Sequence, residues 1–170
     1  IGSPPIIATN IGSATNSGSG STCVITPSAN IPVGATVFVF VEEYQTGANL
    51  SSAQTVVDSA SNTYTCNTGL YSSPTNAVST EIFSAKVTTQ INSGGSITYN
   101  KFNAGNCIVM TAFYATGLAT SGYDSATLAT ATSSSTWAGS KTSGTPSQSG
   151  ELFLQVASFQ IIYCYIVYCL

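Results

Sequence analysis

The sequence is short of charged residues. It has six acidic side chains and three lysines (Lys86, Lys101 and Lys141), with neither histidine nor arginine. Charged residues make up 5% of the chain, against about 25% in a typical soluble domain. Binding to nucleic acid depends on clustered lysine and arginine, so we exclude a nucleic-acid partner. A serine nucleophile needs a base, most often histidine, so we predict that the chain is not an enzyme and has no catalytic residues.

The acidic residues also lack the spacing of a catalytic or metal site. Glu42 and Glu43 are adjacent, so in a strand they point to opposite faces and cannot act as an acid–base pair. No calcium-loop spacing occurs, and without histidine a zinc site would need four cysteines. We therefore predict no metal and no cofactor, and we expect Asp58 to cap a turn. An internal crosslink needs a buried lysine, but Lys86 alternates with Phe83 along the chain, which predicts a solvated amine.

The apolar residues form the pattern of a β-protein. Hydrophobic residues make up 43% of the chain, and Val, Ile, Thr, Tyr and Phe dominate the apolar runs. These runs are short and are separated by clusters of Gly, Pro, Asn and Ser. The predicted fold class is all-β, a β-sandwich or jelly-roll-like domain with Ser/Thr/Gly-rich loops.

Several strands can be placed by their sequence. Residues 35–44 are apolar on both faces and should lie in the centre of a sheet, and residues 106–118 predict a second buried strand. Residues 56–66 and residues 80–102 each predict a hairpin, the first turning at residues 59–62 and the second at residues 92–95. Residues 6–11 predict a short strand, followed by a flexible stretch of Gly, Ser, Thr and Asn.

We predict three parts. Residues 1–19 form an N-terminal arm, which is a candidate for an exchanged strand, and residues 20–160 form the sandwich. Residues 161–170 form an apolar C-terminal strand, which is a candidate for an intermolecular one. Because the sequence starts with Ile1 and not with methionine, we expect a processed form whose leader has been removed.

The segment from Leu152 to Leu170 contains no Gly, Pro or charged residue. One continuous strand of that length would overhang a domain of this size. It could turn near residues 158–160 and pair within its own sheet, or its last ten residues could pair with another subunit. A membrane-spanning helix is disfavoured, since Gln155 and Gln160 lie within the span and no basic residue flanks it. The candidate assembly residues are Ile6, Ile7, Ile161, Ile162, Tyr163, Tyr165, Ile166, Val167 and Tyr168.

The cysteines and one asparagine are candidates for covalent modification. Disulfides in an oxidising compartment are the favoured reading of the cysteines, and buried thiols are the alternative. An odd number of cysteines leaves at least one that is free or that pairs with another chain. Asn49 lies in the sole N-glycosylation sequon. The disulfide candidates are Cys23, Cys66, Cys107, Cys164 and Cys169.

Two short motifs carry a resemblance. Asp58, Asn62 and Tyr64 match a strand that ends in Asp and reaches Asn-x-Tyr through a small-residue turn, and residues 150–152 read Gly-Glu-Leu. Over residues 20–160 the chain resembles a β-sandwich surface module of secreted bacterial and archaeal proteins and of phage virion proteins. That resemblance implies the fold and a cell-surface or virion-surface location, and it carries no catalytic role.

The low charge predicts association, because little repulsion separates copies of the chain. We predict an extracellular structural subunit that assembles with identical subunits into a filament, a pilus-like fibre or a virion surface layer. Assembly would use β-strand exchange or pairing of sheet edges. The alternative is a carbohydrate-binding or adhesive module of a larger surface protein, in which Tyr44, Tyr71, Tyr123 and Trp137 would stack on sugar rings of a glycan.

Overall fold

The structure is a computed structural model. It describes residues 5–17, 20–46, 54–71, 76–101, 107–118, 154–157 and 165–168. For residues 44–46, 68–71, 76–78, 154–157 and 165–168 it describes the backbone alone. The prediction of an all-β fold is confirmed, because every regular element in these ranges is a strand. No helix in the described part of the chain is long and apolar enough to span a membrane.

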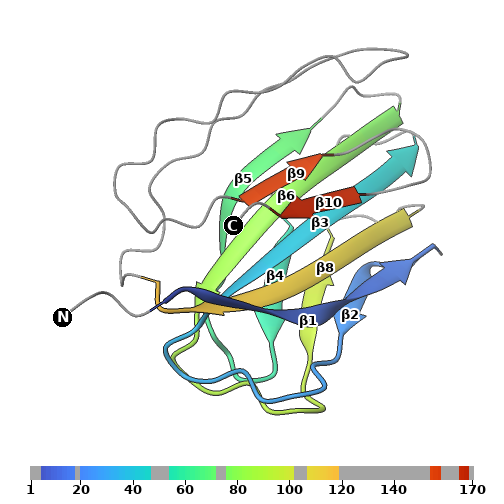
Figure 1. Cartoon of the computed structure of the whole chain (residues 1–170). Coiled ribbons are helices and arrows are strands. Elements are labelled where there is room, and N and C mark those ends of the chain that lie inside the picture. Colours follow the sequence, from blue (N-terminus) through green and yellow to red (C-terminus); the bar gives the residue numbers. More distant parts are fainter. Residues whose placement is uncertain are drawn as a thin grey trace.

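The larger sheet has five antiparallel strands in the order β1-β8-β3-β6-β5. Strand β3 lies at its centre, and β1 and β5 form its two edges (Figure 1). The bounds are β1 (Ile7–Asn16), β8 (Cys107–Thr116), β3 (Thr36–Thr46), β6 (Asn76–Lys86) and β5 (Thr65–Tyr71).

The smaller sheet has three antiparallel strands in the order β2-β7-β4. They are β2 (Thr22–Ile25), β7 (Ile97–Asn100) and β4 (Thr55–Asp58). Strand β1 pairs with β8, β2 with β7 and β3 with β6. Each of these pairs encloses the next one along the sequence, as in a jelly roll. The remaining strand, β5, pairs with β6 at the edge of the larger sheet, so the sandwich has five strands facing three.

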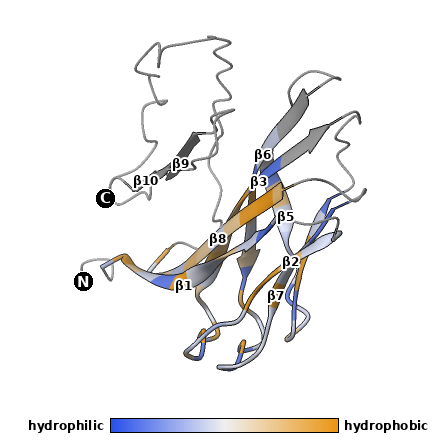
Figure 2. Ribbon diagram, turned by 90° about the vertical axis from the view of Figure 1, so that its right-hand side faces the viewer, coloured by the Kyte–Doolittle hydropathy of each residue, from blue (hydrophilic) through white to orange (hydrophobic). Residues whose placement is uncertain are grey.

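The prediction that residues 35–44 form a central strand is confirmed. Val37, Val39 and Val41 of β3 lie in the core between the two sheets. Phe38 and Phe40 alternate with them on the opposite face, where both rings stack on Phe113 at centroid distances of 5.1 and 5.7 Å. Apolar side chains on both faces are typical of a strand that is covered twice. Figure 2 shows hydrophobic residues, in orange, along strands of both sheets.

The two predicted hairpins are wrong. Strand β4 pairs with β7 while β5 pairs with β6, so residues 59–64 cross from one sheet to the other. Residues 87–96 likewise cross from β6 in the larger sheet to β7 in the smaller one. The strands were predicted correctly, but β4 and β7 pair with each other and not with the strands next to them in the sequence, because a sandwich buries apolar faces by connecting consecutive strands across its core.

Three such connections lie side by side at one end of the sandwich: residues 26–35, 59–64 and 87–96, here called the three arches (Figure 1). Ile31 and Ile91 form a two-way backbone bridge between the first and third arches, with N···O distances of 2.8 and 3.3 Å. The Ser59 N–H donates to the Ser96 carbonyl at 3.0 Å and joins the second arch to the third.

Two polar side chains stabilise the second arch. The Asp58 carboxylate accepts from the backbone N–H of Ala60 at 2.8 Å and of Asn62 at 3.1 Å, which confirms its role as a turn cap. The buried Asn62 side chain donates to Asp58 Oδ2 and to the Thr89 carbonyl. Its Oδ1 accepts from the backbone N–H of Thr88 and of Thr89 at 2.8 and 3.0 Å. Asn62 therefore ties the second arch to the third.

The N-terminal arm is part of the larger sheet of its own chain. Strand β1 pairs with β8 from Ile7 to Asn16, so the strand runs five residues beyond Ile11 and the predicted flexible stretch begins too early. The pairing shifts by one residue between Asn10 and Gly12, and Gly12 has φ 147°. This bulge explains the misplaced boundary, because a glycine that reads as a loop residue serves here inside a strand.

The C-terminal segment contains a separate pair of strands. Strand β10 (Tyr165–Tyr168) pairs antiparallel with β9 (Leu154–Ala157), with Tyr168 opposite Leu154. The predicted reversal of the chain between the two halves of this segment is confirmed, whereas the predicted pairing within the domain's own sheet is not. In the described residues, β10 pairs with β9 and not with a strand of the larger or the smaller sheet.

The first prediction concerns Asn62. Asn62→Ala removes a side chain that satisfies donors and acceptors on two arches, so we expect the free energy of unfolding to fall by about 2–4 kcal/mol. Urea unfolding followed by tryptophan or tyrosine fluorescence measures this. The matched control is Asn92→Ala on the third arch, where an exposed side chain accepts one hydrogen bond from Gln90; we expect a change within about 0.5 kcal/mol. Equal losses in the two variants would contradict the role given to Asn62.

Candidate functional site

Most of the charged residues that the structure describes lie inside the protein. Among the described residues, Glu43, Asp58, Glu81 and Lys101 are buried, whereas Glu42 and Lys86 are only half-buried. Charged side chains are almost never buried without a partner. Asp58 has its partners in the second arch, and the other three buried charges meet in the core between the sheets. That group is the candidate site.

Alternation along the strands places these side chains. Glu43 follows Val41 on the inner face of β3, and Glu81 precedes Phe83 on the inner face of β6. Val41 lies opposite Glu81 in the β3·β6 pairing, so the two carboxyl groups are diagonal neighbours. Tyr99 projects from β7 in the opposing sheet and is completely buried. The cluster therefore spans both layers of the sandwich.

The Tyr99 hydroxyl joins the two carboxyl groups. It lies 2.9 Å from Glu43 Oε2 and 3.0 Å from Glu81 Oε2. A phenol has one proton, so it can donate to only one carboxylate at a time. The other contact is satisfied when that carboxyl group is protonated and donates to the phenol oxygen. The geometry therefore suits a pair with one protonated and one ionised carboxyl group.

Lys101 completes the cluster. It lies two residues beyond Tyr99, so both side chains enter the interior from the same face of the chain. It is 6% exposed and its Nζ has no hydrogen-bond partner. Its backbone N–H donates to the Ser21 carbonyl at 3.0 Å, which holds it in line with β7. Gln54, also buried, adjoins β4 at the end where that strand pairs with Asn100.

The electrostatics follow from burial. Burial raises the pKa of the Glu43 carboxyl above its ordinary value; the hydrogen bond from Tyr99 and the charge of Lys101 lower it, and the charge of Glu81 raises it. Burial and the charges of Glu81 and Glu43 raise the pKa of the Tyr99 hydroxyl, which therefore keeps its proton. The raised pKa of Glu43 favours its protonated form.

This cluster was not predicted from the sequence. Lys86, the lysine weighed for an internal crosslink, is half-buried on the outward-facing side of β6, as its alternation with Phe83 predicts. The sequence did contain a signal for Lys101. Ile97, Tyr99 and Lys101 occupy alternate positions, so in a strand all three side chains point to the same, buried face. Glu43 and Glu42 do point to opposite faces, but the partner of Glu43 is Glu81, thirty-eight residues away in the sequence.

The cysteine candidates are partly placed. Cys23, Cys66 and Cys107 are present as thiols, buried, exposed and intermediate respectively. Burial raises the pKa of the Cys23 thiol, and the nearby Cys107 adds to the effect. Cys164 and Cys169 lie outside the described residues.

The assembly candidates are also partly placed. Ile6 is half-buried against the Phe38, Phe40 and Phe113 cluster, and Ile7 is 56% exposed at the start of β1. Four candidates, Tyr165, Ile166, Val167 and Tyr168, form β10. Outside the described residues lie Ile161, Ile162, Tyr163, the sequon residue Asn49, the residues 150–152 of the late motif, and the aromatic residues Tyr123 and Trp137.

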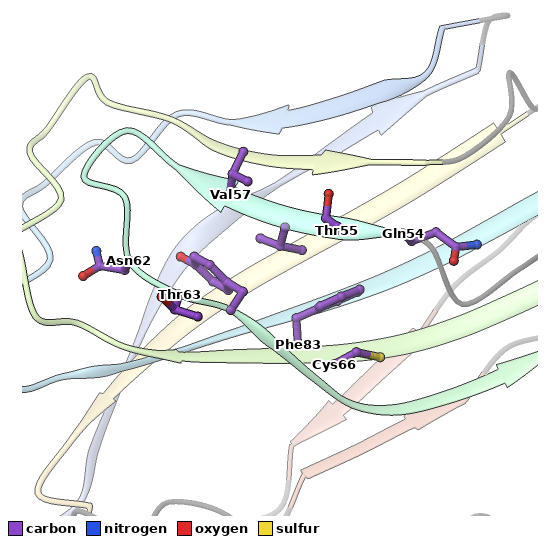
Figure 3. A pocket seen from close by; sticks show the side chains of 9 residues that line it. Gln54, Thr55, Val57, Asn62, Thr63, Cys66 and Phe83 are labelled. Carbon is purple, nitrogen blue, oxygen red and sulfur yellow. The ribbon is translucent and has the colours of Figure 1, made fainter.

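One hollow of about 340 Å³ lies between the edge strands β4 and β5. Figure 3 shows Phe83 and Cys66 on one side of it and Thr55 and Gln54 on the other. It is open and brings together neither a nucleophile with a base nor paired aromatic rings. The hollow marks the side where the three-stranded sheet ends while the larger sheet continues to β5.

Comparison with known proteins gives no match: no family model, no curated protein and no solved structure is significantly similar to this chain. The resemblance carried by Asp58, Asn62 and Tyr64 therefore stays a prediction. The function is argued below from the residues of the chain itself.

The second prediction concerns Tyr99. Tyr99→Phe leaves two buried carboxyl groups without their shared partner, so we expect the free energy of unfolding to fall by about 1–3 kcal/mol. The matched control is Tyr64→Phe. The Tyr64 hydroxyl is buried beside the single carboxylate of Asp58 and does not join two carboxyl groups, so its removal should cost less, within about 1 kcal/mol. Equal losses in both variants, measured by urea unfolding, would count against the bridging role of Tyr99.

The third prediction concerns thiol reactivity. The thiolate is the reactive form, and Cys23 is 3% exposed with a raised pKa. In the native reduced protein we expect a maleimide to label Cys66 at least about tenfold faster than Cys23. In denaturant the two rates should converge. Peptide mass spectrometry at timed intervals measures both, and equal native rates would show that the interior around Cys23 is open.

Proposed function

We propose that the protein is an extracellular structural subunit, and that copies of it assemble through their sheet edges into a filament, a fibre or a surface layer. The observation that carries this proposal is the composition of the edge strands. Strands β1 and β5 border the larger sheet, and β2 and β4 border the smaller one. Together they contain one charged residue, Asp58, and no proline.

Unprotected edges favour association. Sheet proteins that stay monomeric usually place lysine, proline or inward-pointing charge on their edge strands, because open backbone groups bind other strands. Here the single charge on an edge, that of Asp58, is directed into the second arch. No charge on these four strands opposes the approach of a second copy.

Strand β1 is the best-placed edge. Ile7, Ala8, Thr9 and Asn10 are all exposed, and they precede the bulge at Gly12. A bulge interrupts pairing locally, so these four residues form one regular stretch for a neighbouring strand. The edges of the smaller sheet also expose apolar side chains, with Val24 45% and Val57 48% exposed.

The composition supports the location. Hydroxyl and amide side chains, not charges, make up most of the polar residues, which suits a surface built for contact between copies rather than for repulsion. The C-terminal residues 161–170 remain a second candidate for contact between subunits, because β10 pairs with β9 along one edge and an apolar strand needs cover on both faces.

The fourth prediction tests edge pairing. A lysine on a pairing edge places like charges near each other at every subunit contact, so Thr9→Lys should raise the dissociation constant for self-association by roughly tenfold or more. Sedimentation velocity over a range of concentrations, with negative-stain images of the same samples, measures this. The matched control is Val33→Lys, at a 62% exposed position on the first arch, which should assemble as the wild type does.

Truncation separates the two modes of assembly. If a chain lacking residues 161–170 stays monomeric while Thr9→Lys still assembles, strand exchange by the C-terminal segment is the mode and edge pairing at β1 is wrong. A wild-type chain that stays monomeric at every concentration would overturn the proposal as a whole.

A further inference from the structure

We propose that Lys101 and Glu43 form an intramolecular amide bond that joins the two sheets of the sandwich, with Tyr99 and Glu81 positioning the reacting groups. The proposal is independent of the proposed function, because it concerns the interior of one subunit. Its observation is a buried primary amine without a hydrogen-bond partner beside two carboxyl groups that share one phenol.

The geometry places an amine and an acid in one closed space. Lys101 is 6% exposed and Glu43 is 1% exposed. The Lys101 Nζ and the Glu43 Oε1 each lack a hydrogen-bond partner, whereas Glu43 Oε2 is held by Tyr99 at 2.9 Å. An unpartnered ammonium in a protein interior costs several kcal/mol. The charge of Lys101 lowers the pKa of the Glu43 carboxyl, so the amine lies within electrostatic reach of that group.

The surroundings fix the direction of approach. Glu43 is held from one side by Tyr99, and its buried neighbours are Val41 on its own strand, Ser79 opposite it on β6 and Ile108 opposite it on β8. Confinement of two reacting groups in one orientation is worth an effective concentration of about 10⁵ M or more. Exclusion of water from such a site also protects an amide from hydrolysis.

The chemistry balances without any co-reactant. The Lys101 ammonium transfers one proton to the ionised Glu81 carboxylate, and the resulting amine attacks the carboxyl carbon of protonated Glu43. The new C–N bond forms, the C–O bond to the Glu43 hydroxyl breaks, and one water molecule leaves. The products are a neutral amide, a protonated Glu81 and water, and no electron is transferred. The reaction removes the positive charge of Lys101 and the negative charge of Glu81, and an apolar interior favours this loss of charge.

Glu43 is assigned as the electrophile for two reasons. Its Oε1 is unpartnered and buried, and burial raises its pKa, which favours the protonated form that can lose water. Glu81 is then the positioning and proton-accepting residue. The cluster lies at the end of the sandwich opposite the three arches, because β3 and β7 both begin at the arches and reach Glu43 and Lys101 at their far ends.

The fifth prediction is tested by mass. The folded wild-type chain, shown by its cooperative unfolding to be folded, is reduced, denatured and measured intact. We expect its mass to be lower than the sequence mass by one water molecule. Trypsin should fail to cleave after Lys101, so residues 1–86 and 87–141 should remain joined as one branched product. Tandem mass spectrometry of that product locates the bond.

Variants assign the groups. Lys101→Met and Glu43→Met should each restore the full sequence mass, and Lys86→Met, the matched control on the outward side of β6, should keep the loss of water. Glu81→Gln should slow bond formation by at least about tenfold, because it removes the proton acceptor.

A folded wild type with the full sequence mass and normal cleavage after Lys101 would falsify the proposal and leave Lys101 as a buried amine without a covalent bond. A bond from Lys101 to Glu81 would overturn the assignment of Glu43. Neither result bears on assembly, which the Thr9 and Val33 variants test separately.

Discussion

The structure depends on one constraint, which is that strand β3 is apolar on both faces and must be covered twice. Val37, Val39 and Val41 require a layer on one side, and Phe38 and Phe40 require cover on the other. The smaller sheet provides the first layer. Because β3 then has to lie at the centre of the larger sheet, its neighbours β8 and β6 come from distant parts of the sequence, and the chain must cross between the sheets repeatedly. The arches are the consequence of that crossing.

The two ends of the sandwich are held by different interactions. At one end, hydrogen bonds of Asn62 and Asp58 and the bridge between Ile31 and Ile91 join the arches. At the other end, the sheets meet through Glu43, Glu81, Tyr99 and Lys101. A buried ionic group is weak support for stability, since its desolvation offsets its attraction. An amide in the same place would have no desolvated charge, which is why the covalent form suits this interior better than an ion pair.

The fold class and the central strand could be predicted because both depend on local sequence patterns. Residues 35–44, for example, are apolar on both faces. The pairing could not, because a turn-like sequence such as residues 59–62 fits a tight hairpin and an arch equally well, and only the distant partner strands decide between them. The cluster was missed for the same reason. Glu43, Glu81 and Lys101 are separated widely in sequence, and each alone reads as a surface residue. Only the alternation of Lys101 with Tyr99 and Ile97 indicated that its side chain enters the core.

The distribution of charge links the interior to the surface. A protein with so few charged residues would ordinarily keep them outside, where they maintain solubility. This chain instead buries Glu43, Asp58, Glu81 and Lys101, and its edge strands carry no charge other than that of the buried Asp58. Buried charges oppose no partner, and hydroxyl-rich edges present open backbone groups to any strand that approaches. The proposed subunit has to stay folded while neighbouring subunits bind its sheets. Its interior meets the first requirement by holding the two sheets together. Its edges meet the second because they do not repel another copy.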